Sequence, residues 1–263
     1  VLVMEKADKF GGTTRISGGG VAIPNNYLMK AAGTAVSRES ILAYYRRATE
    51  GQSTEELMAA FIDNANVALE WTRDKAGFVW QRLPEPSAFG EYYPYEGRAH
   101  ASHTVYILRE DKVGAGAGLS RNLKEAIDKR GIEVMLKTPG KTLITNAAGE
   151  VIGVIAESEG KEIAIKARRA VLISTGGFEH NKEMVRHFLR GPIHAVNSTP
   201  ERTGDGHLMA MAIGADLRNM NECFGLPHFK PVPGAYSGIA DWQMWRGKPG
   251  AVTVNKHGER IGN

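Results

Sequence analysis

The chain opens with Val1-Leu2-Val3-Met4-Glu5-Lys6, and Gly11-Gly12-Thr13-Thr14 and Ser17-Gly18-Gly19-Gly20 follow shortly after. The first segment is an apolar run that ends in an acid, which is the pattern of a buried parallel strand. At the end of the second strand of a dinucleotide-binding βαβ unit, an acid binds the ribose hydroxyls. Glycine backbone lets N–H groups approach a diphosphate that a Cβ would keep away. Together the two features favour a nucleotide-binding α/β fold.

Each feature also has a plainer interpretation. Taken alone, Glu5 is equally consistent with a solvated strand end, and the glycines with an ordinary loop. The combination of an acid and a glycine-rich segment directly after the same strand shifts the balance toward cofactor binding, because both are needed to hold a dinucleotide.

Further along the chain, the pattern alternates between helical and strand periods. Capping signals and helical spacing predict helices over residues 37–50, from Ser53-Thr54-Glu55-Glu56 onward, and over 119–130 and 181–189. Another helix is predicted to begin after Thr203-Gly204-Asp205-Gly206 and to run to Gly214. A period of two predicts a β-meander of short strands at residues 133–137, 142–145, 151–157 and 162–166. An apolar strand is predicted at residues 170–174, whereas residues 10–26 and 81–105 are predicted to be irregular.

Composition bounds the classes of function. The 263 residues include 33 basic and 29 acidic side chains, so the formal charge of +4 is too weak to indicate nucleic-acid binding. A single cysteine, Cys223, excludes an intramolecular disulfide and a cysteine-cluster metal site. No apolar run of about 18 residues is present to span a membrane. The histidines form no metal-ligand pattern such as HExxH.

The first 26 residues, VLVMEKADKFGGTTRISGGGVAIPNN, closely resemble the second-strand segment of the fumarate reductase / 3-ketosteroid dehydrogenase superfamily of FAD-dependent oxidoreductases. In that family the acid binds the adenosine ribose, and the Gly/Thr/Ser loop wraps the pyrophosphate and the flavin. The resemblance implies that Glu5 and Lys6 contact FAD. It implies the same for the loop residues Gly11, Gly12, Thr13, Thr14, Ser17, Gly18, Gly19 and Gly20.

Two later motifs carry the same resemblance. Ser174-Thr175-Gly176-Gly177-Phe178 matches the family's TGGF segment, which borders the FAD, although a tight strand-to-helix turn would also need small residues. Thr203-Gly204-Asp205-Gly206 matches the family's TGDG segment, which approaches the flavin ring, although Thr or Asp could simply cap the next helix. The resemblance further implies that Gly140 lies beside the adenine.

The aromatic segment Glu91-Tyr92-Tyr93-Pro94-Tyr95 is the candidate for the substrate site. It is similar to the DYxP segment of 3-ketosteroid dehydrogenases, whose tyrosine lines the steroid site, so Tyr92 is the catalytic candidate. Glu91 replaces the aspartate, and Glu96-Gly97-Arg98 departs from the family's PG. Clustered tyrosines also commonly pack without catalysing.

The implied architecture is α/β. A glutathione-reductase-like FAD-binding domain, with a parallel sheet and a β-meander, is expected over residues 1–218, and a substrate-capping α+β domain is expected to begin at residues 219–263. The family's GxGxxG turn lies upstream of its second strand and is absent here. The chain also ends in a strand and turn with nothing after them. Both ends are expected to be cuts, so that the chain is an internal fragment without the first βα unit of the domain.

Three functions are open at this stage. The chain is expected to act on a CH–CH bond, either by 3-ketosteroid dehydrogenase-like desaturation next to a ketone or by fumarate reductase-like reduction of an unsaturated carboxylic acid. Alternatively, it is a catalytically incompetent fragment that binds FAD weakly. The expected partners are a small-molecule substrate and an electron acceptor or donor, with neither nucleic acid nor a membrane span. A cytoplasmic or membrane-peripheral location is favoured over a secreted one.

Overall fold

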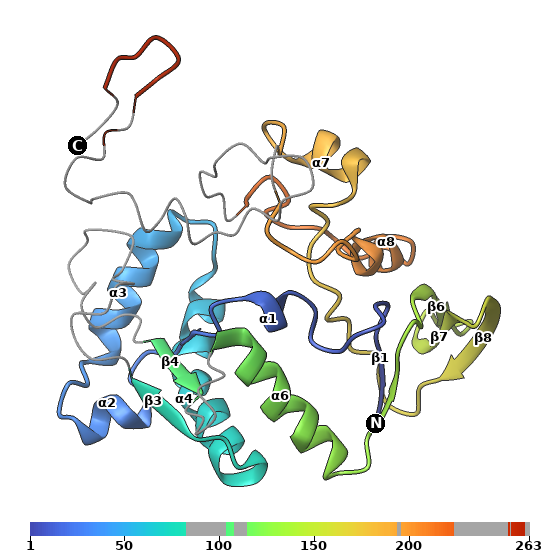
Figure 1. Ribbon diagram of the computed structural model, residues 1–263, viewed down its shortest axis with the longest axis horizontal. Helices are drawn as coiled ribbons and strands as arrows, with labels where there is room; N and C mark the ends of the chain where they lie inside the picture. The colour runs from blue at the N-terminus through green and yellow to red at the C-terminus, as the bar shows by residue number, and fades with distance from the viewer. Residues whose placement is uncertain (83–103, 108–114, 194–195, 224–251, 253, 261–263) are drawn as a thin grey trace. The chain divides into compact units, whose positions relative to one another are not determined.

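A computed structural model describes residues 1–82, 104–107, 115–193, 196–223, 252 and 254–260 (Figure 1). The chain divides into two compact units. The first consists of Val1–Pro139 and Glu157–Glu162, and the second of Gly140–Ala156 and Ile163–Asn263. Most residues after Cys223 lie outside the described part, so the expected domain boundary at residue 219 stays a prediction.

The first unit contains the parallel pair that the opening segment predicts. Strand β1 (Leu2–Met4) pairs in parallel with β5 (Glu133–Met135), with Leu2 opposite Glu133. Parallel neighbours need a long crossover, and helix α6 (Ala115–Asp128) precedes β5. Gly131, with φ +60°, lies in the turn between them. The backbone ladder continues beyond β1 because Glu5 N donates to Met135 O at 2.9 Å.

A second sheet of this unit was not predicted. Strands β2 (Val21–Ala22), β4 (Thr104–Ile107) and β3 (Trp80–Arg82) form an antiparallel sheet in the order β2-β4-β3. A five-residue helix, α1 (Gly12–Ile16), precedes it. The prediction of irregular structure is therefore wrong at these elements, whereas residues 83–103 of the second stretch lie outside the described part. Elements of two to five residues are too short to display a period, and their pairing depends on partners far along the chain.

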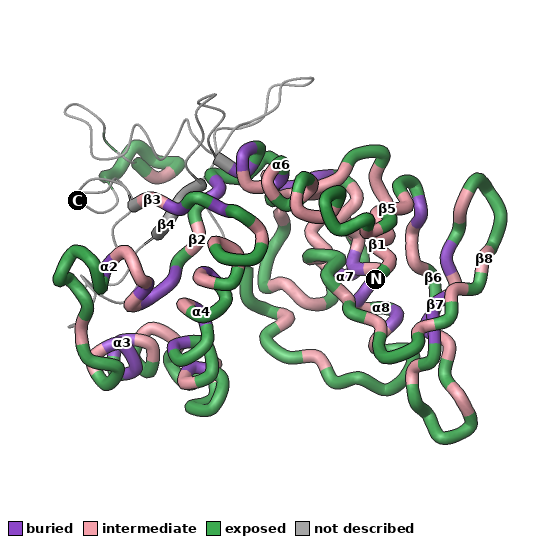
Figure 2. Tube along the Cα trace, turned by 90° about the horizontal axis from the view of Figure 1, so that it is seen from below, coloured by how far each residue is buried: buried purple, intermediate pink, exposed green. Residues whose placement is uncertain are grey.

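The first unit also contains three helices, α2 (Tyr27–Ala31), α3 (Arg38–Thr49) and α4 (Glu55–Ala76). The caps confirm the predicted starts of α3 and α4, since Ser37 accepts from Ser40 N and Thr54 accepts from Leu57 N. Figure 2 shows α3 and α4 alternating between buried and exposed stretches, as amphipathic helices do.

Two apolar clusters form the core of the first unit. One joins α4 to the sheet and the other joins α3 to α4. The first cluster consists of Ile23, Ala65, Leu69, Phe78 and Trp80. The second consists of Ile41, Leu42, Met58 and Ile62.

Three of the four strands predicted for the β-meander form it, whereas the first, at residues 133–137, is instead β5 of the parallel pair. Strands β6 (Gly140–Thr145), β7 (Val151–Ser158) and β8 (Lys161–Lys166) form one sheet in sequence order, and β6 and β7 are antiparallel. Glu159 and Gly160 both have positive φ, which fits the two-residue hairpin turn between β7 and β8.

Helices α7 (Lys182–Phe188) and α8 (Asp205–Met211) follow in the second unit. Helix α7 lies within its predicted range, whereas α8 begins inside the TGDG segment that was predicted to precede it and ends before Gly214. The predicted strand at residues 170–174 is wrong: within the described residues this segment is not paired in a sheet, and Leu172 is 91% exposed. A short apolar run predicts a strand only if a neighbouring strand accepts its hydrogen bonds. The described chain provides no such neighbour here.

Candidate cofactor-binding site

Glu5 lies at the end of β1 in a constrained position. Its backbone N donates to Met135 O and its backbone O accepts from Thr138 N, each at 2.9 Å. One carboxylate oxygen, Oε1, accepts from Ala7 N at 2.8 Å, and the side chain is partly buried. The backbone thus orients the carboxylate at a strand tip, where it would accept a hydroxyl group of a sugar. Lys6 follows directly and is partly buried.

The loop between β1 and β2 contains one glycine, Gly18, that neither backbone conformation nor packing requires within the described part of the chain. At Gly18, an added Cβ would meet no heavy atom within 4 Å in the described part of the chain, and φ does not lie in the left-handed region. Gly12 likewise has open space around the Cβ position, although its φ is +47°. Gly18 and Gly20 are exposed. Bare backbone that neither conformation nor packing explains is what a close ligand would need.

The hydroxyl group of Ser17 has local partners in this loop. Ser17 Oγ donates to Thr14 O at 2.8 Å and accepts from Gly19 N at 3.1 Å, so it fixes the turn that leads from α1 into the glycines. Gly11, with φ +110°, occupies the cap position before helix α1, and α1 has no side-chain cap hydrogen bond among the described residues. Thr13 lies in its first turn. Ser17 therefore shapes the loop.

In the second unit, the structure brings two of the predicted motifs together. An added Cβ on Gly206 would lie 2.3 Å from Thr175 Oγ1, and Gly204 N donates to Gly177 O at 3.1 Å. Asn181, which caps α7, also donates through Nδ2 to Thr203 O at 3.0 Å. The TGG segment and the TGDG segment therefore form one packed site, although they are well separated along the chain.

Asp205 does not cap α8, contrary to the plainer alternative. Gly204, with φ +79°, occupies the cap position, and α8 has no side-chain cap hydrogen bond among the described residues. Asp205 lies in the first turn, where the helix dipole stabilises a negative charge. Its carboxylate accepts a hydrogen bond from Thr203 Oγ1 at 2.7 Å. This arrangement holds the carboxylate at the junction of the two motifs.

Gly140 lies at the start of β6 and faces α8. An added Cβ would contact Met209 at 3.5 Å, an ordinary van der Waals distance, so packing does not demand glycine there. Gly140 is consistent with close approach of a ligand in the same sense as Gly18. Gly140 belongs to the second unit, whereas Glu5 belongs to the first.

An ion pair next to the TGG segment was not predicted from the sequence. Arg202 Nε lies 2.7 Å from Glu179 Oε1, and the two side chains are 27% and 24% exposed. The pair is close but not aligned as a hydrogen bond, because Nε has no hydrogen-bond partner among the described residues. A Cβ on Gly176 would lie 2.6 Å from the Arg202 guanidinium carbon. Such pairs join residues without periodic spacing, so no sequence pattern signals them.

Tyr92 and its aromatic neighbours lie outside the described residues, as do His103 and His194. Across the described residues, no group of three or more His, Cys, Asp or Glu side chains is arranged to hold a metal ion. In the same part of the chain, no helix combines the length and apolarity needed to cross a membrane.

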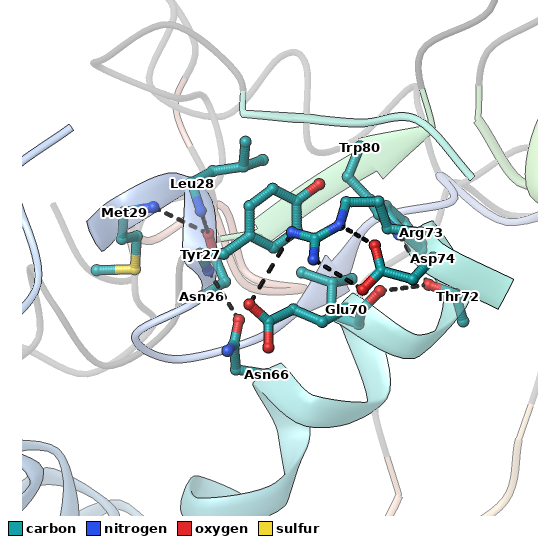
Figure 3. Close-up of polar contacts among 11 residues, drawn as sticks. Asn26, Tyr27, Leu28, Met29, Asn66, Glu70, Thr72, Arg73, Asp74 and Trp80 are labelled. Carbon is teal, nitrogen blue, oxygen red and sulfur yellow. Dashed lines mark hydrogen bonds and ion pairs between the residues drawn. The ribbon is translucent and has the colours of Figure 1, made fainter. Parts of the chain in front are cut away.

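A polar network fixes the exit of the glycine loop (Figure 3). The Asn26 side chain is fully buried and accepts from Leu28 N and Met29 N at 3.1 Å each. The next residue, Tyr27, donates through its backbone N to Asn66 Oδ1 at 2.7 Å. The Arg73 guanidinium lies 4.4 Å from the centre of the Tyr27 ring. Burial raises the pKa of the Tyr27 phenol above its ordinary value of 10.0, and Arg73 opposes that shift.

Taken together, these features fit a dinucleotide cofactor. The strand-tip acid and the open glycine backbone suit the ribose and diphosphate that the first motif predicts. The fit rests on Gly18, where a Cβ would occupy space that the described chain leaves empty.

A model of the FAD binding domain family matches residues 1–263, the whole chain. A 3-oxosteroid 1-dehydrogenase of Comamonas testosteroni is 27% identical over 82% of the chain, and a urocanate reductase of Eggerthella lenta is 29% identical over 99% of it. The chain spans 50% of the first relative and 41% of the second.

A solved structure supports the same assignment. The 3-ketosteroid delta1-dehydrogenase of Sterolibacterium denitrificans, in complex with 1,4-androstadiene-3,17-dione, superposes with a TM-score of 0.81 at 25% identity. The superposition covers 90% of this chain and 54% of that one. The predicted α/β flavoenzyme fold is thereby confirmed, and the family is one that binds FAD. The match along all 263 residues makes this chain a member of the FAD binding domain family.

Proposed function

We propose that the protein is an FAD-dependent oxidoreductase that acts on a CH–CH bond and introduces a double bond next to a ketone. The observation that carries this proposal is the likeness to the steroid-bound 3-ketosteroid delta1-dehydrogenase over 90% of the chain. The Comamonas testosteroni relative, a 3-oxosteroid 1-dehydrogenase, supports the same direction of reaction.

Named residues of this chain would hold the cofactor. Glu5 would accept hydrogen bonds from the ribose, and the backbone of residues 11–20 would surround the diphosphate. The packed site of Thr175, Gly176, Gly177 and Asp205 would border the flavin, and Gly140 would lie beside the adenine. When bound, the isoalloxazine supplies the two-electron chemistry, whereas the protein supplies binding and orientation.

A substitution of Gly18 tests cofactor binding without disturbing the fold. Gly18→Ala adds a methyl group to open space, so the thermal unfolding of the cofactor-free protein should be unchanged. The same methyl group should block the approach of the diphosphate and raise the dissociation constant for FAD by about tenfold or more. Titration of flavin fluorescence measures the affinity.

Gly191→Ala is the matched control. Gly191 also has open space at the Cβ position and no left-handed φ, but it lies outside the candidate site. It should leave both the unfolding temperature and the affinity for FAD unchanged. If Gly18→Ala binds FAD as the wild type does, the assignment of the loop to the cofactor is refuted.

Tyr92 is proposed to line the substrate site, on the strength of the similarity to DYxP. A phenol has an ordinary pKa near 10, so it would need a lowered pKa to act as a base, and a wall or proton-handling role is sufficient. Tyr92→Phe in the intact protein should lower kcat for desaturation while leaving the affinity for FAD unchanged. Equal kcat values would remove Tyr92 from the site.

A second candidate function is the reduction of an unsaturated carboxylic acid. The specific observation in its favour is the urocanate reductase, which is 29% identical over 99% of the chain. Two assays of the intact protein separate the alternatives: oxidation of a 3-ketosteroid with an electron-accepting dye, and reduction of urocanate or fumarate with a reduced dye. Turnover of the acids with none of the steroid would overturn the desaturation proposal.

A further inference from the structure

Helix α6 contacts the glycine loop through its first turn. Gly116 N, in α6, donates to Ser17 O at 2.9 Å. Ser17 in turn binds Thr14 O and Gly19 N through its hydroxyl group. Two hydrogen bonds through Ser17 therefore link α6 to Gly19, and a third ties Ser17 back to α1, all within the first unit.

Only glycine fits at position 116. A Cβ there would lie 1.8 Å from Thr14 O, 2.6 Å from Ser17 Oγ and 2.9 Å from Ser17 O. Two of these three atoms belong to the backbone, which cannot move aside as the end of a flexible side chain can. Alanine is the better helix former. Glycine at this position is thus explained by the close approach of α6 to α1 and not by the helix itself.

Ser120, one turn further along α6, faces the start of the same loop. It is 5% exposed, and its Oγ lies 2.9 Å from the position that a Cβ on Gly11 would occupy. Its Cβ lies 3.1 Å from that position. Within the described part of the chain, the buried Oγ has no hydrogen-bond partner. The side chain therefore acts on Gly11 by its volume.

We infer that Gly116 and Ser120, here called the α6 seat, are positioning residues for the cofactor: they set the shape of residues 11–20 and so control the affinity for FAD. This inference rests on the proposed function. The seat acts through the loop, since Gly116 contacts Thr14 and Ser17, and Ser120 faces Gly11.

Gly116→Ala tests the seat in the intact protein. It should raise the dissociation constant for FAD by about tenfold to a hundredfold, because a small displacement of binding groups costs that much. Hydrogen exchange of the amides of residues 12–20 in the cofactor-free protein should become faster. Gly191→Ala is again the matched control and should change neither quantity. Wild-type affinity in a folded Gly116→Ala protein would overturn the inference.

Two substitutions of Ser120 decide the question if Gly116→Ala does not fold. Ser120→Ala removes Oγ but keeps the Cβ that faces Gly11, so it should weaken the binding of FAD less than Ser120→Val does. Ser120→Val adds a second branch toward Gly11 and should weaken binding in the same way as Gly116→Ala. Equal affinities of the two variants would overturn the role of the seat.

The outcomes also separate this inference from the proposed function. If the wild-type protein binds no FAD, the proposed function fails, while the exchange rates of residues 12–20 still test whether the seat shapes the loop. If the wild type binds FAD and the seat variants bind it equally well, the inference fails and the proposed function stands.

Discussion

Individual glycines in this chain have different physical roles, and the sequence alone does not distinguish them. Gly18 has empty space around its Cβ position, whereas Gly116 has two backbone oxygens within 3 Å of it. Gly204 has φ +79° and occupies the cap position of α8. Substitution by alanine should therefore affect ligand binding at Gly18, the position of α6 at Gly116 and backbone strain at Gly204.

At the residue scale, Tyr27 should titrate above its ordinary pKa. Burial raises the pKa of the folded phenol above 10.0, so the stability that it contributes is full below 10.0 and is lost as the pH rises through the higher folded value. The difference in tyrosinate absorbance between wild type and Tyr27→Phe measures this step. Arg73 lowers the pKa of Tyr27, so Arg73→Met should move the step to still higher pH. A step at or below 10.0 in the wild type would contradict the assignment.

Secondary-structure elements differ in how far the sequence predicts them. Helices α3 and α4 begin where Ser37 and Thr54 provide capping oxygens, and the hairpin at Glu159 and Gly160 forms where the turn residues predict it. These signals involve neighbouring residues only, so they predict helix starts and turns without knowledge of the fold. The strand predicted at residues 170–174 is wrong for the opposite reason, because a strand exists only when a distant segment pairs with it.

At the element scale, the cap of α2 should matter more than the cap of α4. Asn26 is fully buried and serves Leu28 N, Met29 N and Ile23 O, so its loss leaves three backbone groups without that partner. Asn26→Ala should lower the free energy of unfolding by about 2 kcal/mol or more. Thr54 caps an exposed helix end, and Thr54→Ala should cost about 1 kcal/mol. Urea unfolding measures both, and equal losses would contradict the role of burial.

For the whole molecule, the candidate cofactor residues fall into two groups. Glu5 and residues 11–20 belong to the first unit, whereas Gly140, Thr175–Gly177 and Asp205 belong to the second. The motifs predicted each residue type, but only packing brought Thr175 next to Gly206 and Ser120 next to Gly11. Contacts of this kind join segments that are far apart in the sequence and leave no common period.

The stability of the molecule should also fall in acid. Hydrogen bonds from Arg46, Arg38 and Arg73 lower the pKa values of Glu55, Asp63 and Asp74 respectively. Carboxylates with lowered folded pKa values stabilise the protein above their ordinary values of 4.5 and 3.8, and that stability is lost as the pH falls through the folded values. Urea unfolding between pH ~6 and ~3 measures the loss.

The triple variant Glu55→Gln, Asp63→Asn, Asp74→Asn should show a flatter dependence on pH over the same range. All three pairs are exposed, so the difference from wild type should be small and should shrink further at high salt. An identical pH dependence of the two proteins at low salt would show that these pairs do not contribute.

The opening residues established the nucleotide-binding class, because the order of an apolar strand, an acid and bare glycine backbone is encoded within one short segment. Caps and turns likewise follow from neighbouring residues. The packing of α6 against α1, the sheet β2-β4-β3 and the Arg202–Glu179 pair emerged from the fold. Each of them depends on close packing between segments that are distant in the sequence, and those contacts exist only after the chain has folded.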